Sequence, residues 1–222
     1  MKIQSVFDQE FLKYGRIVKE YDFDELIGVV KKEFPAVRKG DDVGIEYQAS
    51  YPPYEETSIF GILNNHYWGG LPCQFGILNG HNFVMNSREY HRCTEILVAV
   101  DDMVLMLGDL RDIKIINGKF SYDTGLTELI LLPKNTAIEM YQTALHYGPC
   151  SAHRNEGYRS VCILPRFVNF PAPTIKISSE EDKALRARGT WVITHPDAPE
   201  AKDGAYVGLT GDNLNIQSLL DS

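Results

Sequence analysis

The residues best suited to chemistry in this sequence lie in one short stretch, E-Y-H-R-C-T-E at positions 89–95. Successive side chains of a strand point to opposite faces, so Glu89 and His91 share one face. Glu95 joins that face by the same parity, unless a turn or bulge at 92–94 changes the phase. Two carboxylates and an imidazole that converge match the oxygen and nitrogen ligands of a divalent cation. The stretch predicts a metal site. The alternative is an ordinary strand face whose polar side chains are exposed to solvent.

A second stretch, LLPKNTAIEMYQTALHYGPC at 131–150, supplies another histidine near the end of an expected strand. Regular alternation places His146 on the face opposite Glu139 and Tyr141. A bulge between Ala144 and His146 would correct the phase, and bulges are frequent beside active sites. His146 is therefore the expected partner of the first stretch.

Length, composition and charge limit the classes of function. The chain has 222 residues, 44% of them hydrophobic and 11% aromatic, which is enough for one globular domain with a sizeable core. Its formal net charge of −8 argues against nucleic acid as a partner, because phosphate binding needs a basic surface. A small molecule is the expected partner.

The N-terminal stretch MKIQSVFDQEF lacks an apolar signal region, and no later run is long enough to span a membrane, so we expect a cytoplasmic protein with no membrane partner. The four cysteines are widely spaced, without a C-x-x-C pair, and are expected to be reduced and mostly buried. Cys150 and His146 could form a thiol–imidazole pair, but no third orienting group lies nearby in the sequence. A cysteine nucleophile is therefore the weaker alternative.

The pattern of apolar residues predicts helices first and strands afterwards. A short helix is expected over 7–14, and a second over 24–34, capped by Asp24 and stopped by Pro35. From about residue 59, short apolar runs alternate with turn residues, as is typical of an antiparallel sandwich or barrel. The expected organisation is one domain over 1–222, with a helical N-terminal appendage (1–58), a barrel core (59–170) and a C-terminal extension that packs on the barrel (171–222).

Two hairpins and a mixed C-terminal region complete this prediction. EILVAV and MVLMLG are expected to pair through a turn at Asp101–Asp102, and a second hairpin turns at Asn117–Gly118. Further on, SSEEDKALRARG predicts a helix and WVITH a strand that covers the barrel. A small closed barrel can hold one ligand among its inward-facing polar residues.

The spacing of the candidate ligands resembles the bipartite metal motif of the cupins. His91 and Glu95 follow the H-x-x-x-E part of that motif, and Glu89 stands where cupins usually have their first histidine. His146 corresponds to the later histidine, although Pro133 is too far from it for the usual P-x-G-x-x-H spacing. The resemblance implies a mostly β cupin barrel (a double-stranded β-helix or jelly roll) that binds one divalent ion, Mn, Zn, Ni or Fe, through Glu89, His91, Glu95 and His146.

Longer blocks carry two further resemblances. FDQEFLKYGRIV and YQTALHYGP are similar to ureidoglycolate lyase, a cupin enzyme of purine breakdown. NGHN, NSREYHRCTEI, TALHYGPC and GLTGDN resemble a bacterial cupin family that includes sulfoquinovose isomerase. This second resemblance covers most of the chain and implies an aldose–ketose isomerase, and we expect a homo-oligomer, with a dimer favoured.

The residues suit such a reaction, which needs a group that polarises the carbonyl, a base for the C2 proton and donors for the other hydroxyls. A metal ion would polarise the carbonyl, and Glu89 or Glu139 would be the base, with Tyr141 beside them. Asparagines that flank a loop, as Asn79 and Asn86 do, are more often turn residues than ligands, whereas a histidine in the position of His81 is as often structural as it is a substrate contact. The pool of expected substrate contacts comprises Gln74, Asn79, His81 and Asn86.

An anionic sugar would need cations at the mouth of this acidic protein, and a planar guanidinium suits a sulfonate or phosphate. His153, Arg154 and Arg166 lie beside the two candidate motifs and are expected to provide them. Two other functions remain open, a lyase similar to ureidoglycolate lyase and a non-catalytic sugar-binding cupin.

Overall fold

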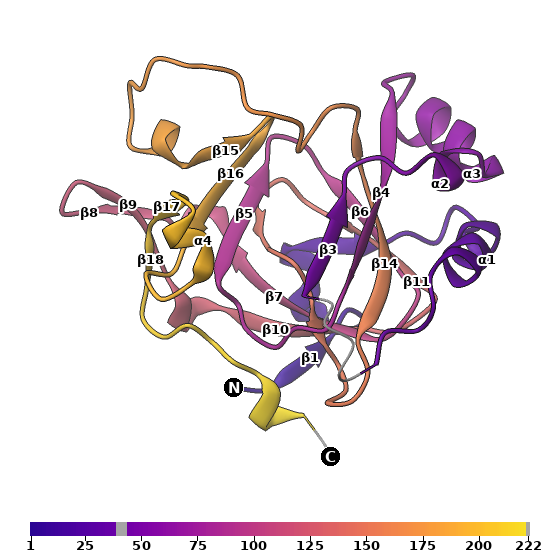
Figure 1. Ribbon diagram of the computed structural model, residues 1–222, viewed down its shortest axis with the longest axis horizontal. Coiled ribbons are helices and arrows are strands. Elements are labelled where there is room, and N and C mark those ends of the chain that lie inside the picture. Colours follow the sequence, from indigo (N-terminus) through magenta and orange to yellow (C-terminus); the bar gives the residue numbers. More distant parts are fainter. Residues whose placement is uncertain (39–43, 221–222) are drawn as a thin grey trace.

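The computed structural model describes residues 1–38 and 44–220, which form a mostly β molecule with several sheets and short helices (Figure 1). The largest sheet has six strands in the order β2-β11-β6-β14-β4-β3. Its members are β2 (Gly15–Ile17), β11 (Thr136–Met140), β6 (Glu95–Ala99), β14 (Tyr158–Pro165), β4 (Cys73–Gly80) and β3 (Ile45–Gln48).

A second sheet of five strands lies opposite the first, in the order β1-β10-β7-β12, with β13 also paired to β7. The first strand pairs in parallel with its neighbour, and the other pairs are antiparallel. These strands are β1 (Ile3–Ser5), β10 (Glu128–Leu132), β7 (Met103–Asp109), β12 (Ala144–Leu145) and β13 (Cys150–Ser151).

Two smaller sheets complete the β structure. In the four-stranded sheet, β16 pairs antiparallel with β5 and β15 and parallel with β17. In the three-stranded sheet, β9 pairs with β8 and β18. The bounds are β5 (Ser87–His91), β15 (Leu185–Ala187), β16 (Thr190–Thr194), β17 (Tyr206–Val207), β8 (Lys114–Ile116), β9 (Lys119–Asp123) and β18 (Leu209–Thr210).

Three of the described α-helices lie together beside the six-stranded sheet, on its outer side (Figure 1). They are α1 (Asp24–Glu33), α2 (Pro52–Glu55) and α3 (Ser58–Ile62), followed by a π-helical turn at Leu63–Tyr67. The fourth helix, α4 (Pro199–Lys202), belongs to the C-terminal region. The 3-10 turns are Gln9–Lys13, Leu110–Asp112, Thr124–Leu126, Glu181–Ala184 and Gln217–Leu219.

Alternation along β6 shows how the two sides of the large sheet differ. Ile96 and Val98 are fully buried in the cluster formed with the helices. Leu97 and Ala99 point the other way, into the core between the two large sheets. Glu95 shares the parity of Leu97, so a carboxylate faces the interior at the start of this strand.

Several expectations agree with the structure. The helix predicted over 24–34 is α1, although Phe23 and not Asp24 is its cap residue. The hairpin at Asn117–Gly118 is confirmed, with both residues at positive φ, as a two-residue turn requires. The strand predicted at WVITH is β16.

Two expectations were wrong for physical reasons. The run around Asp101–Asp102 is not a hairpin, because β6 and β7 lie in different sheets. Both runs are buried along their whole length, so each can serve as an inner strand. The helix expected over 178–189 is a 3-10 turn followed by β15, whose pairing with β16 overrides the local helix propensity.

The expected barrel also differs from what is found. The described strands pair into four sheets and not into one closed barrel. The segment 1–58 contributes β1, β2 and β3 to the large sheets in addition to its helices.

In the described part of the chain, no helix is both long and apolar enough to cross a membrane.

Candidate metal centre and cavity

Strand β5 carries two of the candidate ligands on one face. Glu89 and His91 alternate with Arg88 and Tyr90, which are buried on the other face. On one side, β5 pairs with β16 along its whole length. On its other side, Glu89 exchanges both backbone hydrogen bonds with His146, at N···O distances of 2.6 and 3.0 Å. This isolated bridge brings the distant histidine next to the strand.

Glu95 reaches the same place from the next strand. β5 ends at His91 and β6 begins at Glu95, so a turn over 92–94 separates them, as the sequence allowed. The Oε2 atom of Glu95 lies 3.3 Å from Nε2 of His91 and 3.3 Å from Nε2 of His146. All three side chains are buried. One carboxylate oxygen thus faces both imidazoles.

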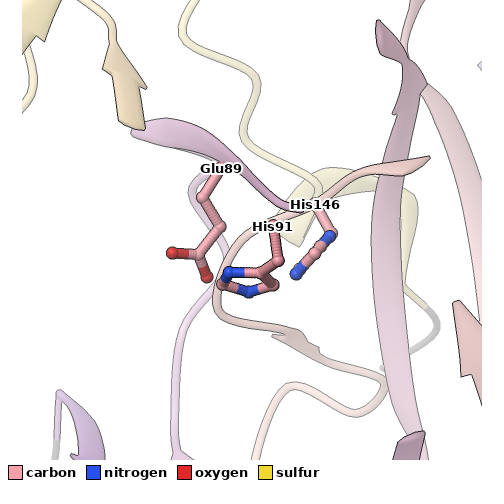
Figure 2. A group of neighbouring side chains, drawn as sticks. All are labelled: Glu89, His91 and His146. Carbon is pink, nitrogen blue, oxygen red and sulfur yellow. The ribbon is translucent and has the colours of Figure 1, made fainter. Parts of the chain in front are cut away.

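Glu89 completes a group that can hold a metal. The ligand atoms of Glu89, His91 and His146 all lie within 4.8 Å of one another. The centroids of the two imidazole rings are 5.2 Å apart. Figure 2 shows Glu89 and His91 projecting from one strand and His146 approaching from a neighbouring segment. The two candidate stretches therefore meet at one point.

Hydrogen bonds at Nδ1 decide which nitrogen of each imidazole faces this point. Nδ1 of His146 lies 2.9 Å from the carbonyl oxygen of Ala144, which can only accept, so this nitrogen carries the proton. Nδ1 of His91 lies 3.0 Å from Oγ1 of Thr190. The Thr190 hydroxyl donates its own proton to Oδ1 of Asn169, so it accepts from His91. In the neutral form, both Nε2 atoms carry lone pairs.

These two Nε2 atoms are buried and have no hydrogen-bond partner in the described structure. Two lone pairs beside a carboxylate oxygen are unfavourable unless a cation, either a proton or a metal ion, lies among them. Histidine nitrogen and carboxylate oxygen are the ligand types of Zn, Mn, Fe and Ni, and a fixed Nδ1 hydrogen bond is the usual support of a metal-binding histidine. The donor set fits a divalent transition metal.

The charges of the group influence one another strongly. Burial alone would lower the pKa of His146, but Glu95 and then Glu89 raise it to about 9. Burial works against ionisation of Glu95, yet the two imidazoles hold the pKa of this carboxyl well below its usual range. Burial raises the pKa of Glu89, while both histidines oppose that rise. Without a metal, a proton shared with Glu95 takes the place of the cation.

The candidate ligands open into a cavity of about 610 Å³. Glu89, Glu95 and His146 lie in its wall, and its apolar part includes Leu97 and Met140 from the six-stranded sheet. Further polar groups come from other segments, namely Tyr47, His81, Asn82, Asn86, Tyr147, Asn169, Arg186, Thr190 and Glu200. A cavity of this size and mixed lining suits a small polar ligand.

Of the expected substrate contacts, His81 and Asn86 line the cavity. Gln74 and Asn79 do not, and both side chains bond to the backbone of neighbouring segments. Asn86 has a positive φ and exchanges hydrogen bonds with Asn213, so it also shapes the loop before β5.

The expected catalytic residues are also separated by the fold. Glu89 lies at the candidate metal group, whereas Glu139 is absent from the cavity lining and accepts a 2.6 Å hydrogen bond from Arg16. Tyr141 does not line the cavity either. Cys150 is buried and accepts a weak contact from Asn82, and burial raises the pKa of its thiol to about 12. In the described structure, this thiol makes no hydrogen bond with His146.

The cations expected at the mouth do not line the cavity. Each is bound elsewhere: His153 to Asp102 at 3.2 Å, Arg154 to the carbonyl oxygen of Leu220 at 3.0 Å, and Arg166 to Glu55 at 2.7 Å.

Among the polar residues of the cavity wall that sequence reasoning missed are Tyr47, Tyr147, Arg186 and Glu200. Tyr147 directly follows His146, and that neighbourhood was a usable signal. The others come from segments with no motif. Burial raises the pKa of Tyr147, and Glu89 and Glu200 raise it further, so its hydroxyl remains a hydrogen-bond donor at neutral pH.

Comparison with protein families identifies the chain. A family described as a domain of unknown function (DUF4867) matches residues 3–214. The chain belongs to this family. A comparison with curated proteins found no match.

Solved structures show distant likenesses. Oxalate decarboxylase of Bacillus subtilis, studied for its Mn(II) centres, is 7% identical over 67% of this chain, with a TM-score of 0.33, and the match spans 31% of that protein's length. A cupin-like protein of Thermotoga maritima is 12% identical (78% of this chain, 96% of that one, TM-score 0.31). SnoN, a non-heme α-ketoglutarate-dependent epimerase of nogalamycin biosynthesis, is 11% identical (80% and 87%, TM-score 0.36).

Proposed function

We propose that the protein is a cupin-type enzyme that holds one divalent metal ion and interconverts an aldose and a ketose. The observation that carries the proposal is the pair of buried Nε2 atoms, on His91 and His146, that share one oxygen of Glu95 at the wall of a cavity. Glu89 supplies a fourth side chain at this point. The four are the ligand set that the cupin resemblance implies.

The cavity offers what the reaction requires beyond the metal. The bound ion would act as a Lewis acid toward the substrate carbonyl. Tyr47, Asn82 and Asn169 present hydroxyl and amide groups for the sugar hydroxyls, and the volume admits one monosaccharide. The apolar lining residues, such as Leu97 and Met140, limit the water that reaches the reacting carbons.

Arg186 supports an anionic sugar as the substrate. It is the one guanidinium or ammonium group among the described lining residues. Its side chain is exposed, and it makes no ion pair or hydrogen bond with the described part of the chain. An unpaired guanidinium at the rim is suited to bind a sulfonate or phosphate.

The test begins with the metal content. Freshly purified protein is expected to contain about one divalent ion per chain, and Mn, Zn, Ni or Fe added to stripped protein should raise the melting temperature. No bound ion, and no stabilisation by any of the four metals, would overturn the ligand assignment.

The activity is tested next with sulfonated, phosphorylated and neutral aldoses in D₂O, followed by NMR. Wild-type protein is expected to exchange the C2 hydrogen of at least one aldose and to form the ketose. His91→Ala and Glu95→Ala should each abolish this exchange while the circular dichroism spectrum remains that of a folded protein. Sugar binding without exchange would show a non-catalytic sugar-binding protein instead.

A further inference from the structure

A carboxylate outside the candidate metal group also faces the cavity. Glu200, in α4 (Pro199–Lys202), lines the wall together with Tyr147. The Tyr147 hydroxyl donates a hydrogen bond of 3.2 Å to Oε1 of Glu200. The other oxygen, Oε2, is buried and has no hydrogen-bond partner in the described structure. A buried carboxylate oxygen without a hydrogen-bond partner destabilises the folded protein, so its presence indicates a functional role.

We propose that Glu200 is the base that removes the C2 proton of the sugar and that Tyr147 positions it. This inference rests on the proposed isomerase function and assigns its proton-transfer group. Three carboxylates are found among the described lining residues, and Glu89 and Glu95 both belong to the group around the imidazoles. Glu200 is the lining carboxylate outside that group, and its Oε2 has no hydrogen-bond partner in the described structure.

The local structure holds Glu200 firmly. The carbonyl oxygen of Glu200 accepts a 3.0 Å hydrogen bond from the backbone N–H of Ala205. Ala198, just before the helix, is fully buried, and its N–H bonds to the carbonyl oxygen of His195 at 3.0 Å. Pro199 is the first helical residue and restricts the backbone there. With Oε1 bound by Tyr147, the orientation of the Glu200 carboxylate is fixed.

The step balances without any oxidant or reductant. A lone pair of the Glu200 carboxylate takes the C2 proton of the open-chain aldose, the C2–H electrons form a C1–C2 double bond, and the carbonyl electrons move to O1. The O2 hydroxyl proton then passes to O1, the carbonyl forms at C2, and Glu200 returns its proton to C1. The net change is the transfer of one hydrogen from C2 to C1 and of one proton from O2 to O1.

The experiment compares Glu200→Gln with Glu33→Gln. Glu33 accepts a 3.2 Å hydrogen bond from Tyr51 outside the cavity, so it is a matched tyrosine-bound carboxylate. Glu200→Gln is expected to lower both kcat and the rate of C2–H exchange by at least about 100-fold, the usual contribution of a general base. Metal content and affinity for the matching alditol, which cannot react, should stay within about twofold of wild type. Glu33→Gln should behave as wild type in every measurement.

The outcomes separate the two proposals. An active wild type with a Glu200→Gln variant of equal kcat and exchange rate overturns the role of Glu200 and leaves the isomerase intact. Loss of metal or alditol binding in Glu200→Gln would make the residue structural and would likewise overturn its role as base. A wild type that exchanges no sugar hydrogen at all overturns both.

Tyr147→Phe tests positioning through the pH profile. A hydrogen bond donated to a carboxylate favours its charged form, so losing that bond should move the acidic limb of kcat/KM to higher pH. A purely structural role would lower kcat without moving the limb, and that result overturns the positioning role. Tyr51→Phe, which removes the matched hydrogen bond to Glu33, should leave the profile unchanged.

Discussion

The Thr190 hydroxyl controls which nitrogen of His91 faces Glu95. It accepts from Nδ1 of His91 because its own proton goes to Asn169, and Asn169 in turn donates to the hydroxyl of Tyr47 at 2.8 Å. This chain of hydrogen bonds runs from the rim of the cavity to the candidate metal group. Its members cooperate, so loss of one weakens the orientation of the others.

Thr190→Val should therefore weaken metal binding while preserving the shape of β16. Loss of the acceptor frees the His91 ring to rotate, and removal of such supporting hydrogen bonds typically costs about 10–100-fold in metal affinity. Competition titration with a chromophoric chelator measures this change. Thr124→Val is the control, because Thr124 is equally buried and its hydroxyl bonds to a backbone carbonyl outside the cavity. Equal metal affinity of Thr190→Val and wild type would exclude this role of the hydroxyl.

The raised pKa of His146 predicts opposite pH responses for the metal-free and the metal-bound protein. The pKa rises from 6.5 to about 9 on folding, so this contribution to stability is complete below pH 6.5 and is lost as the pH rises toward 9. The lowered pKa of Glu95 affects stability at acid pH. The contribution of this carboxylate to folding stability is present above pH 4.5 and is lost as the pH falls below that value. The metal requires a neutral imidazole, so its affinity rises where the metal-free protein loses stability.

Thermal melts between pH 6.5 and 9 check this prediction. The melting temperature of metal-free protein should fall across this window, and the increase produced by added Mn²⁺ should grow. His146→Gln should remove both trends. A metal-free protein whose stability rises through the window would contradict the assigned charges.

At the scale of elements, strand parity made part of the site predictable. The shared face of Glu89 and His91 follows from alternation alone. The place of His146 depends on one isolated bridge, which no local pattern reveals. Arg186 lies in a segment whose pattern predicted a helix and Glu200 in one without a motif, and the positions of both depend on how the C-terminal region packs at the cavity. The wrong hairpin at Asp101–Asp102 has a similar cause, because continuous apolar runs do not reveal which sheet each strand joins.

Two glycine substitutions should shift stability in opposite directions. Gly118 has φ +75° in the β8–β9 turn, so Gly118→Ala should destabilise the protein by about 1 kcal/mol. Gly28 lies inside α1 with open space around its Cα, so Gly28→Ala should stabilise the protein by about 0.5–1 kcal/mol. Urea unfolding of both variants provides the comparison, and the same sign for both would contradict the backbone conformations.

At the scale of the whole molecule, charge opposes the binding of an anionic sugar. The formal net charge is −8, and the cavity wall itself contains three glutamates. A local cation must outweigh this field near the mouth, and screening limits the distant charges to a range of about 8–10 Å. Under the proposed function, Arg186 supplies this cation.

Arg186→Ala should raise KM for a sulfonated or phosphorylated aldose by roughly 10-fold or more, as expected for one charge-assisted contact of about 1.5–3 kcal/mol. A neutral aldose should show no such change. Arg188→Ala is the matched control, because Arg188 lies two residues away, stacks on Phe167 and does not line the cavity. Steady-state kinetics of both variants decide the matter, and equal KM values for Arg186→Ala and wild type on the anionic sugar would remove this arginine from the site.

The pairing of β5 with β16 also has a consequence for biosynthesis. The strand that carries Glu89 and His91 has its long edge partner about a hundred residues later, and Thr190, which orients His91, belongs to that partner. A nascent chain on the ribosome has made all four candidate ligands well before it makes β16. Until then, β5 presents an open edge and a freely rotating imidazole. A metal ion at the candidate group would therefore be held in its final geometry only after β16 has been synthesised.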